Sequence, residues 1–202
     1  MRDLFLKAKH WQLFLLTFAL PLFFYFLIMG FMVFDLVNQT IPDPTTMLNY
    51  MKYFPLIMML SMAVTFGWIW SVTIGLQNKV PENVTIKTTK FKIFFFISLA
   101  YTLLFLIFFN ITINELIALD FESDFEPDFG FIPGLFLLMF PLHLFAIFCI
   151  FYTYYLMAKT YKTVELQRNV TFDDFVGEFF LIMFYPIGVW FIQPKINKMI
   201  DK

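Results

Sequence analysis

The chain has 202 residues, of which 60% are hydrophobic, 22% aromatic and only 14% charged, and its mean hydropathy is +0.76. A soluble globular protein has about 25% charged residues, so this composition cannot cover a surface that faces water. We expect an integral membrane protein in which residues 1–202 form a single membrane domain. The single cysteine, Cys149, excludes an internal disulfide and a cysteine-based metal site.

Four apolar runs are long enough to cross a hydrocarbon core of about 30 Å. The first follows a basic N-terminus, as in a signal peptide, but it is too long for one and no small-residue cleavage site follows it. We therefore interpret it as an uncleaved first helix. The predicted spans are residues 11–34, 54–76, 93–113 and 132–157.

The basic residues predict which way these spans cross the membrane. Lys and Arg resist translocation and remain in the cytoplasm, and the predicted spans leave only Lys52 on the far side. The expected fold is an all-α integral membrane protein of a bacterial inner membrane, with four transmembrane helices and both termini cytoplasmic. The residues placed inside are Arg2, Lys7, Lys9, Lys79, Lys87, Lys90, Lys92, Lys159, Lys162, Arg168, Lys195, Lys198 and Lys202.

A fifth apolar segment, residues 175–192, is at the lower length limit for a span. Thr171 followed by Asp173 and Asp174 is typical of a helix start, with a hydroxyl cap and acids beside the positive end of the helix dipole. We predict a helix over 172–184, a break at 185–188 and a short return leg over 189–192. A full crossing would place three lysines outside, so we favour an amphipathic or re-entrant element at the cytoplasmic face, residues 171–197, over a fifth span.

The end of this element, YPIGVWFIQPKIN over residues 185–197, follows the short motif GEFF over 177–180. Together they resemble a tail found on small bacterial membrane proteins. The resemblance implies no activity and no functional residues, only that the segment is a specific element. We interpret Pro186, Gly188 and Trp190 in it as candidate docking residues.

His143 is the only ionisable residue deep inside a predicted span. Such residues are costly in a membrane and are candidates for a functional site, with Glu178 as the possible second titrating group. A proton relay or a ligand site would fit. We favour the simpler interpretation, in which a neutral His143 hydrogen-bonds a neighbouring helix, for example at the carbonyl that Pro141 leaves free.

Gly67, Ser71 and Gly75 recur every four residues in the second span. Small residues at this spacing form a stripe where another helix backbone approaches closely. The neighbour can belong to the same chain or to a second copy, and we favour packing within the chain.

A repeat of acids and phenylalanines fills the second external loop. It is not an EF-hand, because Phe125 and Phe131 stand where that motif needs Gly and Glu. We favour a solvated loop whose rings enter the headgroup region, with partner docking as the alternative. The candidate docking residues are Asp120, Phe121, Asp124, Phe125, Asp128 and Phe129.

The sequence contains no phosphate-binding loop, no zinc-protease motif and no nucleophile with a nearby base. We therefore expect no enzyme activity, no cofactor, no metal and no nucleic acid. The expected function is a non-enzymatic subunit or scaffold of a membrane protein complex, whose partners are lipids and other membrane proteins or copies of itself. The alternatives are a small homo-oligomeric channel or membrane-disrupting effector and, more weakly, a proton-coupled transporter that uses His143 and Glu178.

Overall fold

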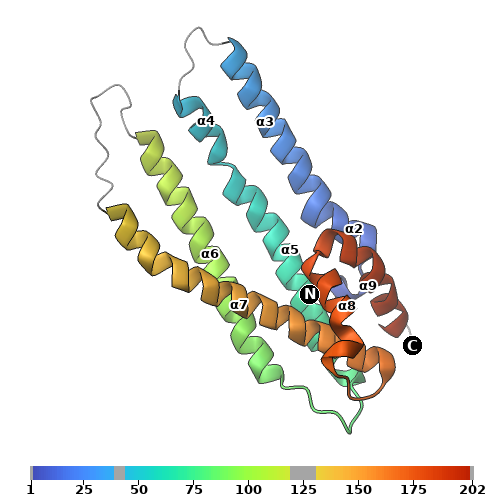
Figure 1. Ribbon diagram of the computed structural model, residues 1–202. Helices are drawn as coiled ribbons and strands as arrows, with labels where there is room; N and C mark the ends of the chain where they lie inside the picture. The colour runs from blue at the N-terminus through green and yellow to red at the C-terminus, as the bar shows by residue number, and fades with distance from the viewer. Residues whose placement is uncertain (1, 39–43, 119–130, 201–202) are drawn as a thin grey trace.

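The computed structural model describes residues 2–38, 44–118 and 131–200, and every regular element in these ranges is helical (Figure 1). One stretch, η1, is π-helical and another, η2, is a 3-10 turn. In chain order the elements are α1 (Arg2–Lys7), α2 (His10–Phe14), η1 (Leu15–Ala19), α3 (Leu20–Asn38), α4 (Pro44–Met51), α5 (Phe54–Gly75), η2 (Gln77–Lys79), α6 (Thr88–Ala118), α7 (Phe131–Leu166), α8 (Phe172–Met183) and α9 (Tyr185–Ile200).

Four helical stretches in the described ranges are long and apolar enough to cross a membrane, which confirms the number of spans and the multi-pass character. They are His10–Asn38, Leu48–Lys79, Thr88–Glu115 and Met139–Leu166.

The helices run further than the apolar runs. The predicted fourth span covers residues 132–157, and α7 continues beyond it to Leu166 through a basic stretch. The extension is stable because Lys162 forms ion pairs with Glu165, one turn further on, and with Glu178 of α8. The helix ends at Gln167, whose φ of 51° is the left-handed conformation common after a helix C-terminus.

The buried core lies at the end of the molecule that carries both termini, which we call the terminal end (Figure 1). There α1 packs against α5 and α9, α2 packs against α9, and α7 packs against α8. The largest side chains buried at this end include Trp68, Tyr161, Phe91 and Phe175. Most of the tertiary packing free energy is therefore concentrated where the two chain ends meet.

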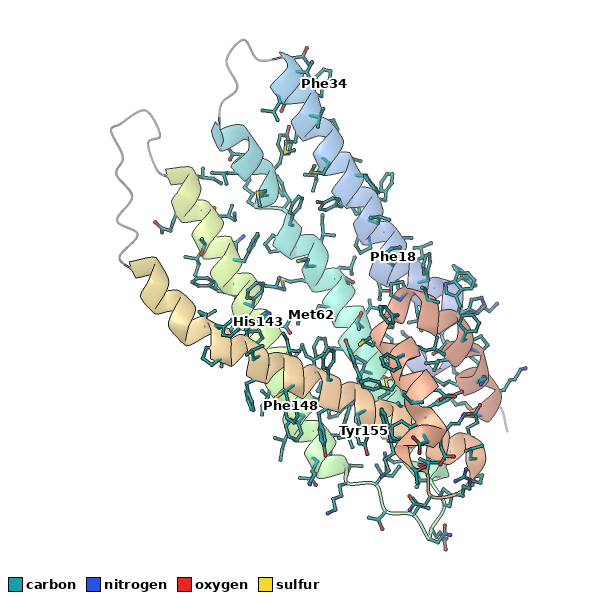
Figure 2. All side chains as sticks on the ribbon, in the orientation of Figure 1. Phe18, Phe34, Met62, His143, Phe148 and Tyr155 are labelled. Atoms are coloured by element: carbon teal, nitrogen blue, oxygen red, sulfur yellow. The ribbon has the colours of Figure 1, made fainter. Side chains whose placement is uncertain are left out.

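Toward the opposite end, which we call the open end, the four long helices diverge (Figures 1 and 2). The helix α3 buries only Met32 among its 19 residues. Large apolar side chains project outward, including Phe26 (65% exposed), Phe34 (66%) and Leu104 (65%). Such surfaces are stable only against lipid or other apolar helices.

The break predicted over 185–188 is wrong in position and extent. The helix α8 does span Phe172–Met183, close to the prediction, but only Phe184 departs from helical geometry before α9 continues from Tyr185 to Ile200. Pro186 lies in the first turn of α9, where a missing N–H costs nothing. Gly188 is buried against α8, so it brings the two helices together instead of ending one.

Candidate functional site

Gln193 of α9 joins three separate parts of the chain at the terminal end. Its side chain is fully buried, and its Oε1 accepts a hydrogen bond of 2.7 Å from the indole N–H of Trp68 in α5. Its Nε2 lies 2.8–3.1 Å from the carbonyl oxygens of Phe5, Leu6 and Ala8, to which it donates. The carbonyls of Phe5 and Leu6 lie in the last turn of α1 and that of Ala8 directly follows it, so none has a donor within that short helix, and Gln193 supplies the missing one.

A second amide and an aromatic ring of α9 strengthen the same contact. Asn197 Nδ2 donates to the carbonyl oxygens of Lys7 and Ala8 at 3.3 and 3.2 Å. The ring of Trp190, a predicted docking residue, lies 4.6 Å from the ring of His10. Trp190 remains 44% exposed, so part of its ring is still available to a partner.

Two glycines allow the close packing of the terminal end. A Cβ on Gly67 would lie 2.6 Å from Cζ of Phe5, so α1 rests on α5 at this glycine. A Cβ on Gly188 would lie 1.7 Å from the carbonyl oxygen of Leu181, so α8 and α9 meet backbone to backbone. At Gly67 the predicted small-residue stripe therefore contacts its own chain. Ser71 in the same stripe is buried and Gly75 half-buried.

Glu178 belongs to a network of ion pairs at the terminal end. Lys162 Nζ lies 2.7 Å from Glu178 Oε1 and 2.7 Å from Glu165 Oε2, and Lys195 Nζ lies 3.1 Å from Glu165 Oε1. The network ties α7, α8 and α9 together. Its acids are matched by lysines, and we assign it a structural role.

His143 lies where α7 crosses α6 (Figure 2). Its Nδ1 is 2.6 Å from the hydroxyl of Tyr101 in α6, and its ring also contacts Phe105. A tyrosine thus takes the place of the backbone carbonyl that we considered as a partner. Lys162, which holds Glu178, lies about 28 Å further along α7 at the 1.5 Å rise of an α-helix, so the structure does not bring His143 and Glu178 together.

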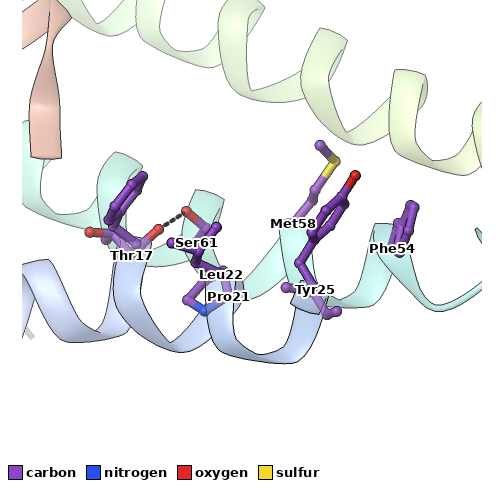
Figure 3. Close-up of a pocket in the computed structure, with 9 residues that line it drawn as sticks. Thr17, Pro21, Leu22, Tyr25, Phe54, Met58 and Ser61 are labelled. Carbon is purple, nitrogen blue, oxygen red and sulfur yellow. Dashed lines mark hydrogen bonds between the residues drawn. The ribbon is translucent and has the colours of Figure 1, made fainter. Parts of the chain in front are cut away.

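The π-helical turn η1 exposes a backbone carbonyl that α5 then satisfies (Figure 3). Pro21 has no N–H, so the carbonyl oxygen of Thr17, four residues earlier, lacks its usual helical donor. Ser61 Oγ donates to it at 2.6 Å. The same residues line one end of an apolar groove of about 280 Å³ between α3 and α5, where Tyr25 stacks on Phe54 at 5.0 Å.

The turn between α7 and α8 is held by a predicted feature, the cap at Thr171. The backbone N–H and the hydroxyl of Thr171 both donate to Asp174 Oδ2, at 2.9 and 3.2 Å, and Arg168 pairs with Asp174 at 2.6 Å. The Arg168 guanidinium, followed by the backbone N–H of Thr171, lowers the pKa of the Asp174 carboxyl to about 2. The carboxylate therefore stays ionised at neutral pH and well into the acidic range.

The acidic loop residues Asp120, Phe121, Asp124, Phe125, Asp128 and Phe129 lie outside the described ranges. Within those ranges, no three His, Cys, Asp or Glu side chains gather as metal ligands would. A pairing that sequence reasoning missed, Tyr50 Oη donating to Asp35 Oδ2 at 2.5 Å, links α4 to α3 near the open end.

No known family model, curated protein or solved structure matches the chain. Its function is therefore inferred from the geometry of the terminal and open ends.

Proposed function

We propose that the chain is a non-enzymatic subunit or scaffold of a membrane protein complex, located in a bacterial inner membrane with both termini in the cytoplasm. The terminal end is the rigid base of the subunit. The open end receives the apolar helices of partner proteins. The orientation is supported by the basic residues, which the charge rule assigns to the cytoplasmic side.

The observation that carries this proposal is the contrast between the two ends. Only 11% of the most apolar window of His10–Asn38 is buried, and only 17% of that of Thr88–Glu115. A self-sufficient helix bundle packs one face of every helix along its length, whereas toward the open end α3 and α6 contact the short helix α4 but leave many of their large side chains exposed. Helices in lipid associate by close packing, so the outward side chains of α3 and α6 offer surfaces for partner helices.

A homo-oligomeric channel is the alternative with less support. It would use the stripe at Gly67 between copies and would direct His143 to the pore. The chain's own Phe5 covers Gly67, so the stripe already packs within the chain there, and the exposed His143 is hydrogen-bonded to Tyr101 of α6. The transporter alternative needs a proton couple between His143 and Glu178. Glu178 is instead ion-paired with Lys162.

Photo-crosslinking in the host membrane tests the proposal. A benzoylphenylalanine would replace Phe26 in α3 or Leu104 in α6, both exposed, and Thr85 in the exposed connection before α6 serves as the control. We expect Phe26 and Leu104 to give protein adducts of discrete mass that Thr85 does not give. Adducts at multiples of 24.1 kDa would indicate copies of the chain and favour the channel. Adducts with lipid alone would contradict the proposal.

A further inference from the structure

A basic pocket of about 620 Å³ opens at the terminal end, between three elements. Lys79 enters it from η2, and Lys195 and Lys198 enter from α9. The C-terminal turns of α7 form its third wall, through Val164, Glu165 and Gln167, and Met199 completes the lining.

The charges in the pocket do not balance. Three lysines face a single glutamate, and Glu165 is already paired with Lys195 and, outside the pocket, with Lys162. Lys79 Nζ donates to the carbonyl oxygen of Met199 at 2.5 Å, which fixes its position and leaves its full charge uncompensated. Lys198 is exposed and makes no hydrogen bond or ion pair with any described residue. The pocket therefore has a net charge of +2 from its lining side chains (three lysines minus one glutamate).

The depth of the pocket limits what can neutralise this charge. Two of the four candidate spans end at its rim, Leu48–Lys79 at Lys79 and Met139–Leu166 next to Gln167. The predicted apolar run 54–76 ends three residues before Lys79, and the α7 wall lies beyond the run 132–157, so the pocket opens on the headgroup side of the hydrocarbon boundary. Basic pockets between transmembrane helices at this level bind the phosphates of anionic lipids. The exposed side chain of Leu166 beside the pocket provides an apolar surface for the start of an acyl chain.

We propose that this pocket binds the phosphate headgroup of an anionic phospholipid, with Lys198 as its unpaired contact, Lys195 as a contact shared with Glu165, and Lys79 as its fixed one. The site goes beyond the proposed function, because it requires no partner protein. A lipid held there would contact η2, α7 and α9 at once and would join the base of the subunit to the membrane surface.

Native mass spectrometry of the full chain, released from micelles that contain equal amounts of phosphatidylglycerol and phosphatidylcholine, tests the site. We expect retained phosphatidylglycerol and little phosphatidylcholine. Lys198→Gln should lower phosphatidylglycerol retention about fivefold, the equivalent of one lysine at a membrane surface. Lys90→Gln is the matched control, because Lys90 is also exposed, lies in the first turn of α6 and is outside the pocket. Lys198→Arg keeps the charge and should retain the lipid.

Three results would overturn the proposal. Equal retention of the two lipids would show that the pocket does not select lipids by the charge of their headgroups. Equal losses in Lys198→Gln and Lys90→Gln would show general attraction to the basic face instead of a site. Inorganic phosphate in millimolar excess distinguishes the source of the phosphate, because displacement of phosphatidylglycerol by it would make a free anion the ligand. Reactivity of the buried Cys149 thiol checks that Lys198→Gln is folded, and Lys195→Gln is the second variant if it is not.

Discussion

Gln193 makes the sharpest prediction about stability, because its buried amide satisfies groups of both the N-terminal segment and α5. Gln193→Leu keeps the volume but leaves the indole N–H of Trp68 and the last carbonyls of α1 without partners. An unsatisfied buried donor costs about 1–3 kcal/mol, and the lost carbonyl contacts add to this. We expect a loss of about 3 kcal/mol in the free energy of unfolding, or about 6–12 °C in Tm at 2–4 °C per kcal/mol.

Two further variants separate the role of the amide from that of the side-chain volume. Gln193→Glu retains an acceptor for Trp68 but turns a carboxyl group toward the three carbonyl oxygens, so it should destabilise more than Gln193→Leu. Trp68→Phe keeps a ring and removes the donor. Because the two residues share one hydrogen bond, the double variant Trp68→Phe/Gln193→Leu should lose less stability than the sum of the single variants.

The single cysteine of the chain provides the unfolding assay. Cys149 is the single cysteine and is fully buried, so a fluorogenic maleimide reacts only as the protein unfolds on heating. Asn78→Leu is the control, because Asn78 is an exposed amide that makes no hydrogen bond with any described residue. If Gln193→Leu and Gln193→Glu both unfold within about 2 °C of the original chain, the reasoning about the terminal end is refuted, since that shift corresponds to less than 1 kcal/mol.

Three other predictions use the same assay. Gly188→Ala should lower the free energy of unfolding by about 3 kcal/mol or more, because its Cβ would lie 1.7 Å from a backbone oxygen of α8. Gly177→Ala is the control, because a Cβ there would have nothing within 4 Å, and it should stabilise the protein by about 1 kcal/mol. Equal effects of the two substitutions would contradict the packing of α8 on α9. Ser61→Ala should cost about 0.5–2 kcal/mol by removing the donor to the carbonyl before Pro21, and an unchanged Tm would argue against that bond. Asp174→Ala should destabilise by a constant amount from neutral pH down to about pH 4, the ordinary carboxyl pKa. Since the folded-state pKa is lowered to about 2, this stabilisation is lost as the pH falls from about 4 to 2, and a difference that persists at pH 2 would contradict the ion pair.

The sequence was sufficient to predict features that depend on local pattern. Apolar runs gave the four spans, because an α-helix is the simplest way for a single run to satisfy its backbone in lipid. The hydroxyl of Thr171 followed by acids predicted the start of α8, because this signal involves only residues within one helical turn.

Features that depend on a distant partner could not be predicted in the same way. The continuation of α7 past residue 157 could not be predicted from the apolar run, because it depends on Glu178 of another helix, which neutralises Lys162. Pro186 and Gly188 together are typical of a helix break. The sequence does not show that Pro186 lies in the first turn of α9 or that Gly188 packs against Leu181 of α8. Gln193 follows an apolar run, which indicates a buried polar contact. Its partners could not be predicted, because they lie 125 or more residues away in the chain.

Native mass spectrometry of the protein extracted gently from its own host membrane tests the central claim most directly. The proposed function requires a fixed stoichiometry with other membrane proteins, bound to the open end. We expect discrete assemblies that contain this 24.1-kDa chain and at least one different chain. A monomer, or a symmetric assembly of this chain alone, would contradict the claim, and the symmetric assembly would favour the channel.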